Sequence, residues 1–207
     1  MSENKEIAKI INDMEKVFSF ITPLVEKKKL KLDDQYKKMN YTYYRVFCCH
    51  LESVYILTKT EHFSSAILLM RTMLEIFVKS YYFEFIEKSK GSNVEDFLGG
   101  EKDFPSFFMM TKALEEYEHE LFGNFKESFK QFTKTGLASY EKFSLFSHGR
   151  GEVLRAFYNS SQFSCSTEQI SDVLLTAKGL FEQLSLLLLF TQNKSKEIGV
   201  VLTFLGK

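Results

Sequence analysis

The chain has 207 residues, with 27 basic and 27 acidic side chains and therefore no formal net charge. This balance excludes a strongly basic nucleic-acid binder and a protein with an acidic tail. The 2 prolines and 10 glycines exclude collagen-like, linker-rich and disordered chains. The length suits one domain over residues 1–207, and 22 phenylalanines with 10 tyrosines predict an aromatic core.

The cysteines and the first residues indicate a compartment. Cys48 and Cys49 are adjacent and Cys165 stands alone, so the cysteines form no spaced disulfide framework. Residues 1–9 are polar and charged and contain no signal-peptide stretch. The longest apolar run, Leu186–Phe190, is too short to span a membrane. We therefore expect reduced thiols in a soluble cytoplasmic protein that has no membrane contact.

The first third of the chain predicts two long helices. Apolar residues recur every three or four positions over residues 7–21, and this first helix ends at Pro23 or at the lysines 27–29. Asp33 or Asp34 caps the second helix. The back of the second helix is charged and carries Lys38, Arg45, Glu52 and Lys59.

A third helix is predicted over about residues 62–87, and it is apolar on all sides. Such a helix is usually buried at the centre of a bundle. Within it, Arg71 and Glu75 are four residues apart and about 40° apart around the axis. We expect both to be buried as an ion pair. One interpretation is an internal salt bridge that sets helix register; the other is the charged floor of a polar cleft.

Residues 88–105 hold glycines, Asn93 and Pro105 and predict a loop with one short turn. Shorter helices are then predicted at about residues 106–121, 124–132, 137–147 and 152–158. Thr167 caps a long last helix with a near-heptad apolar stripe, and the apolar tail 198–205 either packs back or meets a partner. The fold class is therefore all-α, an antiparallel helical bundle of four to five main helices plus short helices.

The segment from Tyr140 to Gly151 is the second candidate for chemistry. Glu141, Ser144 and His148 share one helix face, and His148 stands at the helix C-terminus before a glycine stop. Arg150 follows between two glycines, and Arg155 lies five residues later. A histidine beside two arginines suits a phosphate-bearing substrate. The ordinary alternative is a capping histidine with solvated arginines.

Other motifs give weaker indications of a functional site. By helical geometry Arg45 faces outward, whereas His50 lies among apolar neighbours as a core histidine. The four histidines are scattered and no zinc spacing or phosphate-binding glycine loop occurs. We therefore expect neither a metal nor a cofactor.

Two stretches together resemble a known group. Ser64–Glu75, followed by Tyr81 and Tyr82, resembles the A-x-x-L-x-R-x-x-x-E helix of uncharacterised bacterial helical proteins. Tyr140–Gly149 resembles their later Ser…His-Gly helix. This group is similar to the HEPN-like bundles.

The resemblance implies a helical bundle, frequent homodimers, and roles in toxin–antitoxin or phage-defence systems. Active members are metal-independent ribonucleases with an Arg-x4-6-His motif late in the domain. His148 matches the motif histidine, and Lys142, six residues before it, stands where an arginine is expected. Arg71 and Glu75 match the recurring pair of the earlier helix.

Two functions follow as hypotheses. In the first, the protein acts on RNA, with His148 as general acid or base and with Arg71, Arg150 or Lys142 holding phosphate charge. In the second, the chain is a non-catalytic helical module for dimerisation or for binding a partner protein, and the Arg71–Glu75 pair is structural. A small-molecule sensor, with a pocket between the third helix and the Ser144–His148 face, is a third alternative.

Overall fold

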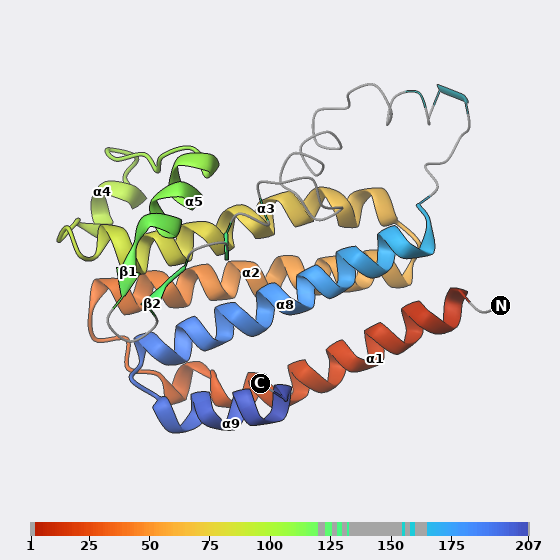
Figure 1. Cartoon of the computed structure of the whole chain (residues 1–207), viewed down its shortest axis with the longest axis horizontal. Coiled ribbons are helices and arrows are strands. Elements are labelled where there is room, and N and C mark those ends of the chain that lie inside the picture. Colours follow the sequence, from red (N-terminus) through yellow and green to blue (C-terminus); the bar gives the residue numbers. More distant parts are fainter. Residues whose placement is uncertain are drawn as a thin grey trace.

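The computed structural model describes residues 3–119, 123–125, 128–129, 132, 155, 158–159 and 165–206. In this part of the chain the fold is all-α, which confirms the predicted fold class (Figure 1). The long helices are α1 (Glu3–Ile21), α2 (Gln35–Lys59), α3 (Phe63–Tyr82) and α8 (Thr167–Thr191). Three shorter ones are α4 (Val94–Leu98), α5 (Phe107–Glu116) and α9 (Ser195–Leu205).

The helix ends in the first third follow the predicted signals. Helix α1 ends at Ile21, so of the two alternative stop signals Pro23 is confirmed, and the lysines form a separate 3-10 turn, Lys27–Lys29, after the turn Thr22–Leu24. Pro23 lacks an amide hydrogen and occupies the start of the first turn. Asp34, not Asp33, caps α2, because its carboxylate accepts the amide hydrogen of Lys37 at 2.9 Å.

Helix α3 continues into a π-helical segment, Phe83–Glu87, so together they occupy the range predicted for the third helix. Most of its side chains are buried, as expected for the centre of the bundle. One stripe is less covered, and it comprises Leu68, Arg71, Thr72, Glu75 and Lys79. The expectation of a helix apolar on all sides is therefore wrong along this stripe, and the stripe is where the ion pair lies.

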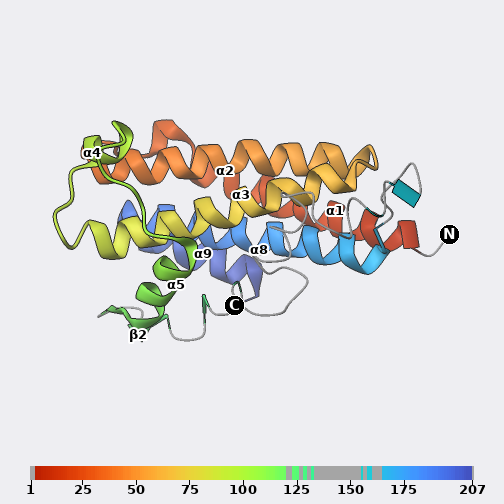
Figure 2. The same ribbon diagram turned by 90° about the horizontal axis from the view of Figure 1, so that it is seen from above.

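The four long helices lie side by side, and their directions are not simply alternating (Figures 1 and 2). Helix α2 is antiparallel to α1, α3 and α8. Helix α8 runs in the same direction as α1. Lys178 of α8 pairs with Asp13 of α1 at 2.7 Å, and further along both helices Phe181 packs on Phe18 with ring centroids 4.8 Å apart. Helix α8 therefore begins at the end of the bundle where α1 and α3 also begin.

Helix α8 begins with a capping box that moves its start by one residue. Ser166 accepts from the backbone of Gln169 at 3.2 Å, and the Gln169 side chain accepts from the backbone of Ser166 at 2.9 Å. The prediction of Thr167 as the cap is therefore wrong. By length and composition α8 is able to span a membrane, with a mean hydropathy of 1.6, but 61% of that apolar stretch is buried inside the bundle.

The apolar tail forms α9 and packs back on the bundle. Val201 is fully buried, and the ring of Phe204 stacks on Phe20 of α1 at 3.8 Å between centroids. Of the two alternatives for the tail, packing back is thus confirmed. Val200 and Phe204 nevertheless remain 45% and 42% exposed.

The predicted helix over residues 106–121 ends early. Ser106 caps α5, which ends at Glu116, and Tyr117 is extended. A short ladder follows, in which β1 (Glu118–His119) pairs antiparallel with β2 (Gly123–Asn124). The helix ends early because acidic side chains are unfavourable at its negative C-terminal end, where the run of glutamates from residue 115 onward lies.

Candidate functional site

The ion pair predicted on α3 is formed. The Nε atom of Arg71 lies 3.4 Å from Oε1 of Glu75. The side chains are 24% and 31% exposed, so the expectation of full burial is wrong: both are half-buried. The reason is their place on the less covered stripe of α3. Both residues also make contacts beyond this pair.

This placement defines what the pair is able to do. A guanidinium that is half-exposed keeps its charge without the large desolvation cost of a buried ion. Glu75, one turn later, orients the planar group through Nε. Arg71 is thus a positioned cation near the surface, which suits the recognition of a phosphate or carboxylate.

Most of the other predicted site residues lie in a part of the chain that the structure does not describe. Lys142, Ser144, His148 and Arg150 lie outside the described residues. Arg155 lies within them and is exposed. The convergence of the two stretches on one cleft therefore stays a prediction.

A second polar feature was not predicted as a site. A groove of about 520 Å³ lies along α2 where the α1–α2 connection passes it. We call it the basic groove. Its lining residues are Lys27, Leu32, Lys38, Tyr41, Thr42, Arg45, Val46 and Cys49. Three of the eight side chains are cationic and none is acidic.

Helical spacing explains how the groove forms. Lys38, Tyr41, Arg45 and Cys49 follow one another at three or four residues and so share one side of α2. The 3-10 turn at Lys27–Lys29 brings a further lysine to the rim. Arg45 is exposed, which confirms its predicted outward direction.

The cations of the basic groove have no acidic partners among the residues that the structure describes. The carboxylates close to them in the sequence are engaged elsewhere: Asp33 and Asp34 pair with Lys37, and Glu26 pairs with Lys28. Across the described ranges, Lys27, Lys38 and Arg45 make no ion pair. The groove is therefore a local excess of positive charge on a chain that is neutral as a whole.

The opposite arrangement occurs at the end of α3, which we call the lysine–glutamate clamp. The π-helical segment places the carboxylates of Glu84 and Glu87 inward, where they are 5% and 3% exposed. Lys88 binds Glu84 at 2.5 Å, while Lys90 and Lys102 bind Glu87 at 2.9 and 2.5 Å. Lys102 lies in the loop after α4, so the clamp fastens that loop to the bundle.

The two clamp carboxylates have pKa values shifted in opposite directions. Burial raises the pKa of Glu84, and the hydrogen bonds from Lys88 and Asn40 only partly oppose this. For Glu87, burial also acts to raise the pKa, but the hydrogen bonds from Lys102, Ser92 and Lys90 outweigh burial and lower the pKa to about 2. Glu87 is thus the charged centre of the clamp.

A second cavity, of about 450 Å³, lies between α3 and α8. Its wall is largely aromatic, with Phe77, Tyr81, Phe125, Phe129 and Phe132. Its volume is in the range of small-molecule sites.

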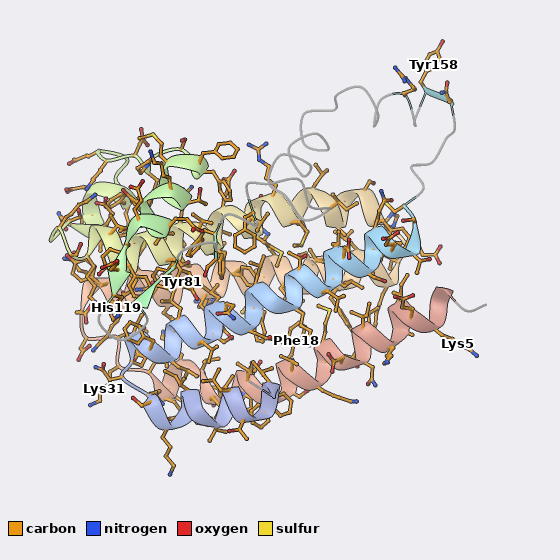
Figure 3. All side chains as sticks on the ribbon, in the orientation of Figure 1. Lys5, Phe18, Lys31, Tyr81, His119 and Tyr158 are labelled. Carbon is orange, nitrogen blue, oxygen red and sulfur yellow. The ribbon has the colours of Figure 1, made fainter. Side chains whose placement is uncertain are left out.

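Figure 3 shows Tyr81 within the bundle, while Lys5 and Lys31 project from opposite ends of the molecule.

Comparison with protein-family models, with curated proteins and with solved structures finds no match to this chain. In the portion of the chain that the structure describes, no group of three His, Cys, Asp or Glu side chains is placed to hold a metal ion. Function must therefore be argued from the chain's own side chains.

Proposed function

We propose that this chain is a HEPN-like helical-bundle protein of the cytoplasm that acts on RNA in a defence or toxin-type role. The observation that carries the proposal is the Arg71–Glu75 pair, formed and left half-exposed on the central helix. The all-α bundle and the resemblance of Ser64–Glu75 and Tyr140–Gly149 to that group support it.

In the proposed chemistry, Arg71 binds a phosphate of the RNA and Glu75 holds its guanidinium in place. His148 transfers the proton, because an imidazole titrates near neutral pH. The 2′-oxygen attacks the neighbouring phosphorus and gives up its proton, and the 5′-oxygen leaves and takes one. Lys142 and Arg150 offset the charge on phosphorus, while Ser144 and Arg155 contact the substrate. This route needs no metal.

The test is cleavage of labelled single-stranded RNA in the presence of a chelator. His148→Ala should lower the rate by about 100-fold or more, the usual contribution of a general acid or base. His62→Ala is the matched control, because His62 is an exposed histidine at the start of α3 and makes no side-chain cap. RNA left intact by the native protein, or equal rates for the native protein and His148→Ala, overturns the catalytic proposal.

The alternative is a non-catalytic module that forms homodimers or binds a partner protein. Val200 and the part of Phe204 that its stacking on Phe20 leaves exposed lie one turn apart on α9. They favour this alternative, since exposed apolar side chains on one helix suit a helix–helix contact. Light scattering after size exclusion tests it. Val200→Glu should convert a dimer to a monomer, whereas Lys196→Glu on the same helix should not. A native monomer rejects the dimer.

A further inference from the structure

We infer that the basic groove binds the sugar–phosphate backbone of single-stranded RNA, with Tyr41 as a stacking surface for a base. The choice of RNA among polyanions rests on the proposed function. The site itself does not, because none of its residues belongs to the Arg71–Glu75 pair or to the segment around His148.

Charge is the first argument. Lys27, Lys38 and Arg45 are exposed, line one groove and have no acidic partner in the described part of the chain. Elsewhere the lysines of this neutral protein are frequently paired, as Lys37 and Lys102 are. A cluster of uncompensated cations attracts phosphate by direct attraction and by release of counterions.

The order of residues along α2 is the second argument. Lys38 and Arg45 are seven residues apart, which is about 10.5 Å along a helix axis. Tyr41 lies between them and is half-buried against the core, so its ring is held in place. Cation, ring and cation in succession match phosphate, base and phosphate of a single strand.

The form of the groove is the third argument. Its volume of about 520 Å³ exceeds what one phosphate ion needs, and its main wall is the outer side of one helix. Such an open surface binds backbone and stacks a base without enclosing the base edge. We therefore expect binding with little sequence preference and a strong dependence on salt.

The first experiment is fluorescence anisotropy with a labelled single-stranded RNA of about 12 nucleotides. The double variant Lys38→Glu/Arg45→Glu should raise the Kd by about tenfold or more and reduce the salt dependence. Lys5→Glu/Lys9→Glu is the matched control, because it changes the net charge equally on exposed positions of α1. Equal weakening by both double variants overturns the inference.

The second experiment tests the ring. Tyr41→Ala should weaken RNA binding by about tenfold, whereas Tyr41→Phe keeps the stacking surface and should bind within about twofold of the native protein. Binding unchanged in Tyr41→Ala removes the stacking role. Inorganic polyphosphate and vesicles of acidic phospholipid are the competing polyanions. If either binds as tightly as RNA does, the assignment to RNA is wrong.

The third experiment uses Cys49 as a reporter inside the groove. Cys49 is exposed, whereas burial raises the pKa of the Cys48 and Cys165 thiols to about 11. A maleimide near neutral pH should therefore modify Cys49 first, since the thiolate is the reactive form. Bound RNA should slow this modification several-fold, and Cys49→Ser should abolish the fast phase.

These readouts separate the groove from the proposed catalysis. Cys49 protected by RNA in His148→Ala, whether or not RNA is cleaved, supports the groove. A protein that protects Cys49 but cleaves no RNA keeps the inference and loses the catalytic proposal. A protein that cleaves RNA while Cys49 reacts at an unchanged rate overturns the groove.

Discussion

Two lysine-rich regions of this molecule use the same side chain in opposite ways. In the lysine–glutamate clamp, three lysines converge on the buried carboxylates of Glu84 and Glu87. In the basic groove, three cations share a surface with no carboxylate among them. The role of a lysine in this protein therefore depends on which acid the fold brings to it. The clamp holds structure, and the groove is available to a ligand.

The largest expected effect comes from breaking the clamp at its centre. Glu87→Gln keeps the volume but leaves the ammonium groups of Lys90 and Lys102 without a counter-charge. We expect a loss of about 2–4 kcal/mol in the free energy of unfolding. Urea unfolding followed by circular dichroism measures it.

The control for Glu87→Gln is Glu101→Gln, because Glu101 is exposed and lies in the same loop region. It should change stability by less than about 0.5 kcal/mol. Equal effects of the two substitutions would show that the clamp does not stabilise the fold.

The pH dependence of stability sharpens the same contrast. The pKa of Glu87 is about 2 in the folded chain, below its ordinary value of 4.5, so its contribution is present above 4.5 and is lost as the pH falls toward 2. Glu84 acts in the opposite direction, because its raised pKa makes ionisation costly at neutral pH.

Unfolding measured at about pH 5 and about pH 3 tests this sign. The native protein should lose stability between the two, and Glu87→Gln should lose less. A variant with the same pH dependence as the native protein would place the acid-sensitive group elsewhere.

The ion pair on α3 should have an intermediate effect. Because Arg71 and Glu75 are half-buried, Arg71→Ala should cost about 1–2 kcal/mol and not the 3–5 kcal/mol typical of a fully buried pair. The exposed pair of Lys112 and Glu116 is the comparison, and Lys112→Ala should cost less than about 0.5 kcal/mol. A loss above about 3 kcal/mol for Arg71→Ala would show that the pair is structural.

The smallest effect is expected in the basic groove. Lys38→Glu/Arg45→Glu removes no ion pair with a described residue, so stability should change by no more than about 0.5 kcal/mol while RNA binding falls. Thermal unfolding of the same preparations used for binding measures it. A loss of several kcal/mol would show that the groove, like the clamp, is a structural device.

Much of the fold was predictable from local signals. Periodic apolar residues located the long helices, Asp34 and Ser106 capped α2 and α5, and the glycines between α3 and α5 marked a loop. The last helix was misplaced by one residue because the reciprocal bonds of Ser166 and Gln169 outweigh a neighbouring threonine. The short β ladder had no periodic signal, since each strand has two residues.

The candidate site was predictable only in part. The Arg71–Glu75 pair follows from a four-residue spacing and is present, whereas its half-exposure depends on which side of α3 its neighbours leave uncovered. The basic groove was missed because Lys27 and Arg45 lie on different elements. The available signal was the helical spacing of Lys38, Tyr41 and Arg45 after a run of lysines.

The helices of this protein follow from the local sequence, because caps, periodicity and charge at helix ends act within a few residues. Only the packing of distant segments places α8 parallel to α1, brings Lys102 across a loop to Glu87, and leaves Lys38 and Arg45 without an acidic partner among the described residues. The interactions that decide these two outcomes differ in their range along the chain. Hydrogen bonds of the backbone form between near neighbours, whereas the solvation and pairing of a charge depend on whichever distant segment the fold packs beside it.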